Sequence, residues 1–577
     1  MFKGHPKGLF VAFFANMGER FSYYTILAIF VLYLQARFGF STGEAGDYYG
    51  GFLFGIYFLP ILGGIIADRW GYGRTIIAGI LIMFFGKILL SAPGFTRAGY
   101  FSTQWEIIVI IIALFIISLG TGLFKGNLQA LVGKLYDDPR FAPKRDNAFN
   151  IFYMGINVGA FFAPYAATSI VNYILGRKGF TYENNMPHLA NLNEKAHPFL
   201  DKMIHTVQSN FAGASDYTGK IQAFQQQMGF SGTLSEFADT YNTTLSTGYS
   251  GAFAIAAVSM IISLAVFMVF RKHYEYADLT ARQAEAKAAR EGKETTKMRM
   301  SRQEEKKRLI ALGLVFITVA FFWMAFHQNG FTLTIFARDY TVSDVSRFDY
   351  MFFDLRTFIP ILVAIGGLIF MFRRNSSARS RMTGASLLVV GSAIAYWVYT
   401  TFEPNPVIEP QLFQSFNPIF IVFLTPLIVG FFNWLRKQGK EPSSPKKIGI
   451  GMFLTALGFV VMLLGAFKLQ AVTGLSPYWL IGTYFTLTIA ELFLSPIGIS
   501  FVSKVAPPRF HGLAQGGWLG ATAIGNLLAG LVGKLWDIVE LWQFFLLLIV
   551  LTVLSGIFIF SIMKILENAT KSQTDNP

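Results

Sequence analysis

The chain contains no cysteine among its 577 residues, and charged residues are scarce. The first absence excludes disulfide bridges, thiolate metal sites and thiol nucleophiles. Asp, Glu, Lys and Arg make up only 14% of the chain while hydrophobic residues make up 53%, a balance that soluble globular domains do not have. The sequence also offers no nucleophile with a base, no metal-ligand cluster and no phosphate-binding loop, so it gives no support to a membrane-embedded enzyme.

Long apolar runs dominate what is present. A membrane-spanning helix needs ~20 predominantly apolar residues, and runs of that length predict an all-α membrane protein with about fourteen spanning helices. Because Glu19 and Arg20 interrupt the first run and no small-residue cleavage site follows, we expect no cleavable signal peptide. The runs lie at about 8–35, 45–67, 74–92, 106–131, 146–171, 249–270, 309–336, 353–372, 383–402, 416–435, 448–469, 478–502, 511–536 and 541–564.

The formal net charge of +15 is concentrated in loops that fall on one side of this arrangement. Cytoplasmic loops are rich in Lys and Arg, so the pattern predicts that both termini are cytoplasmic, and it argues against nucleic-acid binding as the source of the charge. The basic positions on this side are Arg69, Arg74, Lys134, Arg140, Lys144, Arg145, the segment 271–308, Arg373 to Arg381, Arg436 to Lys447 and Lys504.

Two polar segments divide the runs. Residues 172–248 have no spanning run and fall outside the membrane, where we interpret them as an extracytoplasmic cap rather than a binding module. Their histidines, His188, His197 and His205, lack metal-ligand spacing. Residues 271–308 form a basic cytoplasmic linker with a helical composition and a break near Gly292.

The predicted organisation follows from these divisions. It consists of helices 1–5 in residues 1–171, the polar segment 172–248, helix 6 at 249–270, the linker 271–308, helix 7 at 309–336, an extra helix pair at 353–402, helices 8–12 in 416–564 and a cytoplasmic tail at 565–577.

Four charged residues inside apolar runs stand out: Glu19, Arg20, Lys125 and Glu491. Each costs about 2.5 to 3.5 kcal/mol at the bilayer centre, so each needs a partner or a water-filled cavity. Glu19 and Arg20 could instead form a static ion pair, and Lys125 could extend to the headgroups. Glu491 is flanked by apolar residues on both sides, and a buried carboxyl without a fixed cation is suited to exchanging a proton.

Other polar residues extend this pattern. Asn16, Arg20, Tyr23, Tyr24 and Leu27 recur at three- and four-residue spacing, which places them on one face of the first helix and predicts that this face lines a cavity. His327 lies deep in the seventh-helix run, either as a hydrogen-bonded structural residue or as a group that titrates near neutral pH.

The segment GGIIADRWGYGRT at 63–75 resembles the loop between the second and third helices of the major facilitator superfamily. Six further motifs, spread over both halves in the same order, resemble the proton-dependent oligopeptide transporter (POT) family of that superfamily. They are NMGERFSYY at 16–24, GTGLFKGN at 120–127, FYMGINVGA at 152–160, FFWMAFHQNG at 321–330, QSFNPIF at 414–420 and ELFLSPIG at 491–498. The resemblance covers nearly all helices but not 172–248.

The resemblance implies two six-helix bundles plus two extra helices, and a proton-coupled symporter that imports di- and tripeptides through the bacterial cytoplasmic membrane by alternating access. It implies no cofactor other than the proton as coupling ion, and no partners beyond a small peptide and the lipid bilayer. Proton coupling is implied for Glu19, Arg20 and Lys125, and we add Glu491 and His327 as candidate proton sites because of their depth in apolar runs. Substrate binding is implied for Arg20, Tyr23, Tyr24, Tyr57, Lys125, Asn157, Gln328, Asn417, Glu491, Ser495 and Trp518.

Within that scheme the cations bind the peptide carboxylate, Asn157 and Asn417 hydrogen-bond the peptide backbone, Glu491 meets the amino terminus, and Trp518 walls a side-chain pocket. A zwitterion needs a cation at one end and an anion at the other, and the two bundles would supply one each.

Three residues depart from the family pattern. The family motif usually begins with a glutamate where this chain has Asn16, and it often has an arginine at Leu27 and an acid at His327. We therefore hypothesise that His327 supplies a different proton site or gate contact. The pair at 353–402 is also unusual, because bacterial relatives usually place two extra helices in the central linker; we interpret it as peripheral.

Two other readings remain open. The same fold could carry a different cargo, such as nitrate, a drug or a peptide-like metabolite, although a nitrate site would not need Glu491. A non-transporting receptor or scaffold would use 172–248 and the basic linker as binding surfaces.

Overall fold

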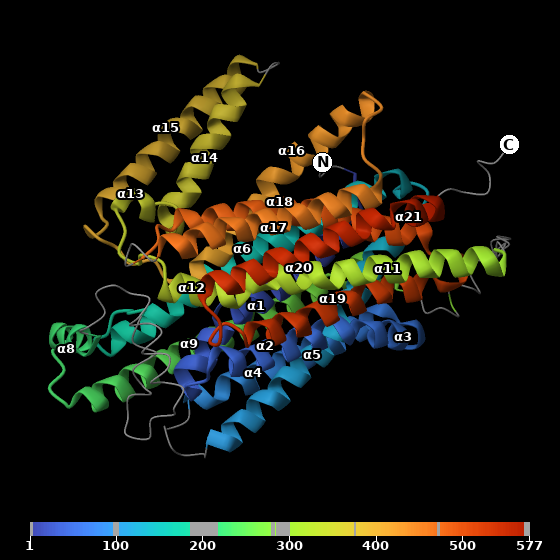
Figure 1. The fold of residues 1–577 in the computed structure, drawn as a ribbon. Coiled ribbons are helices and arrows are strands. Elements are labelled where there is room, and N and C mark those ends of the chain that lie inside the picture. The colour runs from blue at the N-terminus through green and yellow to red at the C-terminus, as the bar shows by residue number, and fades with distance from the viewer. Residues whose placement is uncertain are drawn as a thin grey trace.

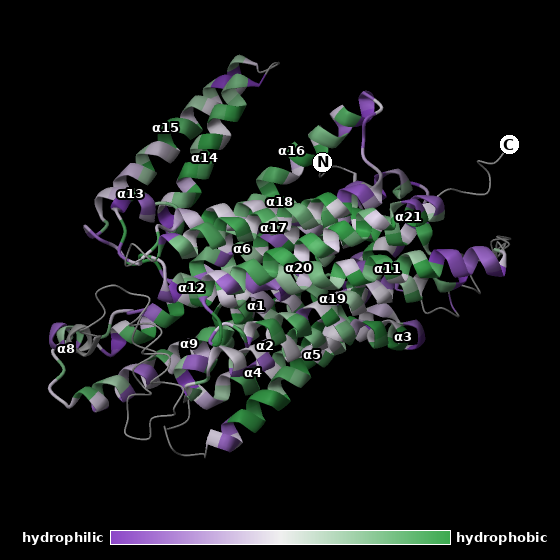
Figure 2. Cartoon of the chain, in the orientation of Figure 1, coloured by the Kyte–Doolittle hydropathy of each residue, from purple (hydrophilic) through white to green (hydrophobic). Residues whose placement is uncertain are grey.

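The computed structural model describes residues 4–95, 103–184, 217–278, 283, 300–373, 377–469 and 474–570. Within these residues, fourteen helices are long and apolar enough to cross a membrane. Most of them run roughly parallel to one another, whereas α14 (Leu355–Phe372), α15 (Ala378–Thr400) and α16 (Phe416–Lys437) lie at an angle to the rest, and most of their residues are hydrophobic (Figures 1 and 2). The prediction of an all-α membrane protein with about fourteen spans is confirmed.

The N-terminal bundle contains the first six spans, of which the second is divided in two by Pro60. Proline lacks an N–H and is tolerated at the first position of a helix, so α3 begins there. The helices are α1 (Lys7–Phe38), α2 (Thr42–Phe58), α3 (Pro60–Trp70), α4 (Tyr72–Ser91), α5 (Thr103–Lys134), α6 (Arg145–Arg177) and α9 (Leu234–Val269).

The C-terminal bundle also contains six spans. Its first span consists of α11, a 3₁₀ turn and α12, so the seventh helix of the sequence prediction is broken at His327. The elements are α11 (Arg302–Phe326), η8 (His327–Gly330), α12 (Thr332–Asp339), η9 (Pro410–Ser415), α16 (Phe416–Lys437), α17 (Ser444–Lys468), α18 (Tyr478–Val505), α19 (His511–Gly533), α20 (Leu541–Ser561) and the short α21 (Met563–Thr570).

Glycines permit close helix approach within and between the bundles. A Cβ on Gly79 of α4 would lie 2.7 Å from the carbonyl oxygen of Gly120 on α5. Between the bundles, a Cβ on Gly530 of α19 would lie 2.3 Å from the carbonyl oxygen of Gly46 on α2. Small residues of this kind let membrane helices pack backbone to backbone, which brings α2 and α19 together as a contact between the two halves.

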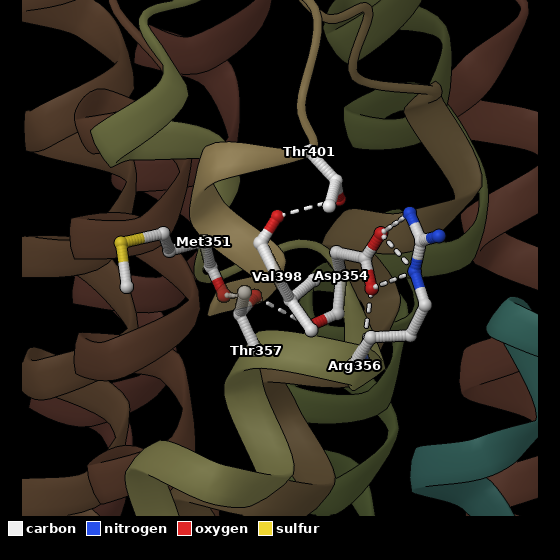
Figure 3. Close-up of polar contacts among 6 residues, drawn as sticks. All are labelled: Met351, Asp354, Arg356, Thr357, Val398 and Thr401. Carbon is white, nitrogen blue, oxygen red and sulfur yellow. Dashed lines mark hydrogen bonds and ion pairs between the residues drawn. The ribbon is translucent and has the colours of Figure 1, made fainter. Parts of the chain in front are cut away.

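The extra helix pair forms a hairpin of α14 (Leu355–Phe372) and α15 (Ala378–Thr400). The hairpin projects away from the two bundles, as Figure 1 shows. At its base, Asp354 caps α14 by accepting a 2.7 Å hydrogen bond from the backbone N–H of Arg356, whose guanidinium also pairs with the Asp354 carboxylate (Figure 3). Most of the hairpin surface is exposed and apolar, which agrees with its interpretation as a peripheral pair.

Two boundaries differ from the sequence prediction. The sixth span begins at Leu234 rather than at residue 249, because Thr233 and Glu236 form a capping box that starts the helix inside the polar segment. The polar segment also contains α8 (Tyr217–Gln227). His188, His197, His205 and the centre of the basic linker, with Gly292, lie outside the described residues.

Because the number of spans is even, both chain termini lie at the same end of the helices. We call this end, where α1 begins and α20 ends, the termini end, and the other, with the loops 39–41 and 534–540, the opposite end. Several polar contacts join the two bundles at the opposite end. They are Thr42 to Asp537 at 3.0 Å, Lys534 to Asp47 at 2.8 Å, Arg338 to Gln35 at 2.8 Å, Gln411 to Thr168 at 2.8 Å, and Asn172 to Glu409. The structure is therefore closed at this end.

Candidate functional site

Glu19 and Arg20 form a bidentate ion pair in the middle of α1. Arg20 Nε lies 2.5 Å from Glu19 Oε2, and Arg20 Nη2 lies 2.7 Å from Glu19 Oε1. Both side chains are buried, so the pair is desolvated, and its attraction must offset the cost of removing two charges from water. In this conformation Glu19 and Arg20 form the ion pair that the sequence analysis gave as an alternative, and Arg20 is occupied by Glu19.

Aromatic rings surround the cations of this bundle. The Arg20 guanidinium lies 4.7 Å from the centre of the Tyr23 ring, which packs edge-on against Tyr24 at 4.9 Å. Lys125 of α5 places its Nζ 3.5 Å from the centre of the Tyr57 ring on α2. Lys125 therefore does not extend to the headgroups in this structure, and a cation–π contact replaces an ion pair.

The carboxyl group of Glu491 lies on the facing bundle. Asn417 of α16 donates a 3.0 Å hydrogen bond to Glu491 Oε2 and another 3.0 Å bond to Thr488 Oγ1. Among the described residues, no Lys, Arg or His lies within 4.0 Å of this carboxylate. Pro496 lies about one and a half turns further along α18 and has no N–H to donate to the carbonyl of Leu492. That carbonyl, one residue after Glu491, therefore lacks its helical hydrogen bond from residue 496.

Tyr24 and Tyr57 connect the two sides of the site. Both hydroxyls interact electrostatically with Arg20 and with Glu491, so they lie within range of the N-terminal cations and the C-terminal acid at once. Both side chains are only partly buried, as are Lys125 and Glu491. The arrangement presents a cationic wall and an anionic wall with tyrosines between them, which suits a zwitterionic molecule.

Trp518 of α19 is buried against α18. A Cβ on Gly498 would lie 2.1 Å from Trp518 Cη2, so only glycine leaves room for the indole at this position. Ser495 is partly buried on the same helix, one turn after Glu491. These positions agree with a wall of the site beside the acid.

Asn157 and Gln328 are placed differently from each other. Asn157 is partly buried and donates a 3.2 Å hydrogen bond to the carbonyl of Tyr153 in its own helix. Gln328 is fully buried, and its amide joins the carbonyls of Met324 and Ala529 while its oxygen accepts from Thr332. In this conformation its polar atoms hold η8 against α19, and a role for Gln328 in substrate binding stays a prediction.

His327 lies between the two bundles. Its Nδ1 is 3.1 Å from the carbonyl oxygen of Trp323, and its ring lies 6.1 Å from the Tyr57 ring. Tyr49 of α2 donates a 3.1 Å hydrogen bond to the backbone carbonyl of His327. Leu27 packs near Gly330 instead, so the positions where the family has an ion pair are filled here by apolar and backbone contacts.

Sequence reasoning missed a buried cation inside an apolar run, Lys87 of α4. It is 1% exposed, and its Nζ donates a hydrogen bond to Ser22 Oγ on α1. The signal was present, because Lys87 lies within the run 74–92 and the rule that selected Lys125 applies to it equally. Among the described residues, no group of three or more His, Cys, Asp or Glu could hold a metal ion.

The chain resembles known transporters over nearly its whole length. It is 28% identical to the peptide transporter YePEPT of Yersinia enterocolitica over 92% of this chain and 88% of that protein. It is 25% identical to the di-/tripeptide transporter of Lactococcus lactis subsp. cremoris over 98% of this chain and 96% of that protein. It is also 27% identical to the uncharacterized transporter YclF of Bacillus subtilis, over 92% of this chain and 89% of that protein.

Solved structures show the same fold. A crystal structure of a mutant peptide transporter POT in complex with alafosfalin superposes with a TM-score of 0.64 at 22% identity, over 99% of this chain and 97% of that chain. A POT family transporter in complex with 5-aminolevulinic acid gives a TM-score of 0.63 at 21% identity, over 99% of this chain and 98% of that chain. The expected major facilitator fold is thereby confirmed.

The sequence profile described as the POT family matches residues 73–184 and 385–541, in both bundles. Together with the relatives and the fold, this match confirms the resemblance drawn from the motifs: the chain is similar, in both bundles, to the membrane transporters of the POT family.

Proposed function

We propose that this protein is a proton-coupled symporter that imports di- and tripeptides across the cytoplasmic membrane by alternating access. The observation that carries the proposal is the placement of Arg20 and Lys125 on one bundle and Glu491 on the other, with Tyr24 and Tyr57 within electrostatic range of both sides. A peptide carboxylate would bind the cations, and its ammonium group would bind Glu491.

The names of the relatives support the peptide as cargo. The Yersinia and Lactococcus proteins are named peptide and di-/tripeptide transporters, and each aligns over most of both chains. A peptide also explains the paired amides, because Asn157 and Asn417 would give one hydrogen-bond partner to the peptide backbone from each bundle. The proposal assigns the protein no enzymatic reaction and no cofactor.

Glu491 is the residue that we assign to proton transfer between water and the site. It has an amide donor and no cation within ion-pair distance among the described residues, so its charge is balanced only when substrate or a proton is present. Proton entry then drives the cycle, because one charge moved through ~100 mV is worth about 2.3 kcal/mol.

The orientation in the membrane follows from the basic loops. Arg69, Arg74, Lys134 and Arg436 all lie at the termini end, which therefore faces the cytoplasm by the positive-inside rule. The opposite end, where polar contacts join the bundles, would then face outward.

A second cargo class has one specific observation in its favour. Asn16, Leu27 and His327 replace ionisable or differently charged family residues, and a POT family structure similar to this chain holds 5-aminolevulinic acid, a zwitterion that is not a peptide. A peptide-like zwitterion would still use Arg20 and Glu491 but would not need both amides. Uptake that survives Asn157→Ala and Asn417→Ala together would favour it.

The experiment that tests the proposal is dye-reported acidification of proteoliposomes under an inside-negative potential after addition of dialanine. We expect acidification with the wild-type protein and none with Glu491→Gln, which keeps the shape of the side chain but cannot carry a proton. No acidification by folded wild-type protein would overturn the proposal. A deletion within 185–216 that leaves uptake intact would also argue against the scaffold alternative.

A further inference from the structure

Lys87 is a buried cation without an acidic partner of its own. Its side chain is 1% exposed, and Ser22 is its hydrogen-bond partner among the described residues, where no carboxylate lies within 4.0 Å of it. Ser22 in turn donates its own proton to the carbonyl of Ala256 on α9. A hydroxyl gives an ammonium group far less than it loses on leaving water, so a structural hydrogen bond alone does not account for a lysine here.

Glu19 is the acid that acts on Lys87 electrostatically, and it already has a partner in Arg20. Ser22 follows Glu19 by three residues on α1, so their Cβ atoms lie roughly 6 Å apart on the same side of the helix. Glu19 and Arg20 are the two charged groups that act on Lys87 electrostatically. Residues 107–124 of α5 and 240–269 of α9, which flank α4, contain no charged side chain. The titratable residues of those two stretches are Tyr241 and Tyr249 of α9.

During transport Arg20 could pair either with Glu19 or with the carboxylate of a bound substrate. Glu19 pairs only with Arg20 among the described residues. When a substrate carboxylate binds Arg20, it competes with the bidentate contact between Arg20 and Glu19. Glu19 would then be a buried carboxylate without a cation, which is a costly state. Lys125 does not fill the vacancy here, because its Nζ lies over the Tyr57 ring.

We propose that Lys87 is the alternative partner of Glu19: when substrate engages Arg20, Glu19 exchanges its ion pair from Arg20 to Lys87 and stays ionised. This inference rests on the proposed function, since it requires a carboxylate substrate at Arg20. Lys87 is a positioning residue, because it acts on Glu19 and does not touch the substrate. The exchange makes no covalent bond and takes up no proton, so substrate binding need not protonate Glu19.

The proposal predicts how many protons accompany binding. In Lys87→Met, Glu19 has no second cation, so it takes a proton from water each time substrate displaces Arg20. The slope of log Kd against pH for dialanine should therefore increase by one, which is an extra tenfold loss of affinity per pH unit. Lys87→Arg keeps the charge and should keep the wild-type slope. Lys504→Met, an exposed lysine at the termini end, is the matched control.

Two further variants make the test specific to the pair. The double variant Lys87→Met with Glu19→Gln should return to the wild-type slope, because no carboxylate remains to be protonated. Glu19→Gln alone should also keep the wild-type slope. Because this comparison needs no Lys87 variant, it tests whether Glu19 takes up a proton on binding even if Lys87→Met does not fold.

The outcomes separate this inference from the proposed function. An unchanged slope in folded Lys87→Met would overturn the role of Lys87. A slope lowered by one in Glu19→Gln would show that Glu19 is protonated on binding in the wild type, and it would overturn that role as well. Wild-type protein that binds no dialanine at any pH would instead reject the peptide substrate, and the Lys87 proposal with it.

Discussion

The Lys125 ammonium group lies 3.5 Å from the centre of the Tyr57 ring, and this contact links α5 to α2 at the site. A buried lysine more often pairs with a carboxylate, but Glu19 is occupied by Arg20 and Glu491 lies on the other bundle. The ring holds the cation by its negative face without neutralising it, so the positive charge stays available to a substrate.

This contact predicts that the ring of Tyr57, rather than its hydroxyl, positions Lys125. Tyr57→Leu should weaken dialanine binding by about 1 to 2 kcal/mol, roughly five- to thirty-fold in Kd, whereas Tyr57→Phe should stay within about threefold of wild type. Equilibrium binding of labelled dialanine measures both. Equal losses in the two variants would assign the effect to the hydroxyl instead.

A second prediction concerns Trp518. In Gly498→Ala the new methyl group would lie 2.1 Å from the indole, so the indole must shift from its present position. We expect destabilisation of about 1 to 3 kcal/mol in thermal unfolding and a selective loss of peptides with large side chains. Gly126→Ala is the control, since a Cβ there meets nothing within 4 Å. Unchanged peptide selectivity would remove Trp518 from the side-chain pocket.

Closure of the opposite end should depend on pH through Glu409, which lies outside the spanning segments. Burial raises the pKa of Glu409 to about 7, even though Asn172 and Gln411 donate hydrogen bonds to it. In water a glutamate titrates near ~4.3, so the closed state binds the proton more tightly than an open state would. Closure is therefore most favourable below about pH 4.3 and weakens as the pH rises toward about 7.

The expected change is about tenfold in the ratio of closed to open molecules per pH unit across that window. Because the chain has no cysteine, spin labels on Lys178→Cys and Glu403→Cys report the separation of the bundles directly. In Glu409→Gln the side chain cannot ionise, so the distance distribution should lose this pH dependence and stay closed. A variant that keeps the wild-type pH response would exclude Glu409 as its origin.

His327 stays a prediction as a proton site or gate contact. Its Nδ1 faces the carbonyl of Trp323, and Lys125 acts on the ring electrostatically, so protonation would place two cations close together. We expect His327→Gln to shift the pH profile of uptake without abolishing binding. Pulse uptake of dialanine between pH 5 and 8 checks this, and superimposable profiles would reject the hypothesis.

Much of the architecture could be predicted because apolar length alone determines which segments cross a membrane. The start of α9 could not, since the capping box of Thr233 and Glu236 begins the helix within a polar stretch that has no spanning hydropathy. The break at His327–Gly330 was equally invisible, and the 3₁₀ turn there places the Gln328 amide against the carbonyl of Ala529 on α19.

The site was predictable to the extent that charge in an apolar run is unusual. Glu19, Arg20, Lys125 and Glu491 were found in this way, and the structure places them around Tyr24 and Tyr57. Glu409 was missed because it lies in a loop, where a carboxylate is unremarkable until the fold buries it between α6 and η9. Such burial depends on contacts far apart in the chain.

The hairpin of α14 and α15 has a consequence for how the chain could acquire it. Its two ends return to the same place, where the backbone of Ile408 bonds to Ser343 at 2.9 Å and that of Val345 to Pro406 at 3.2 Å. Two added crossings return the chain to the side of the membrane from which it started, so every helix after Thr400 keeps its direction across the membrane. A single inserted helix would have inverted the rest of the chain, placing the basic loop after Arg436 on the wrong side and turning Glu491 out of register with Arg20. An insertion at this point therefore had to be a pair.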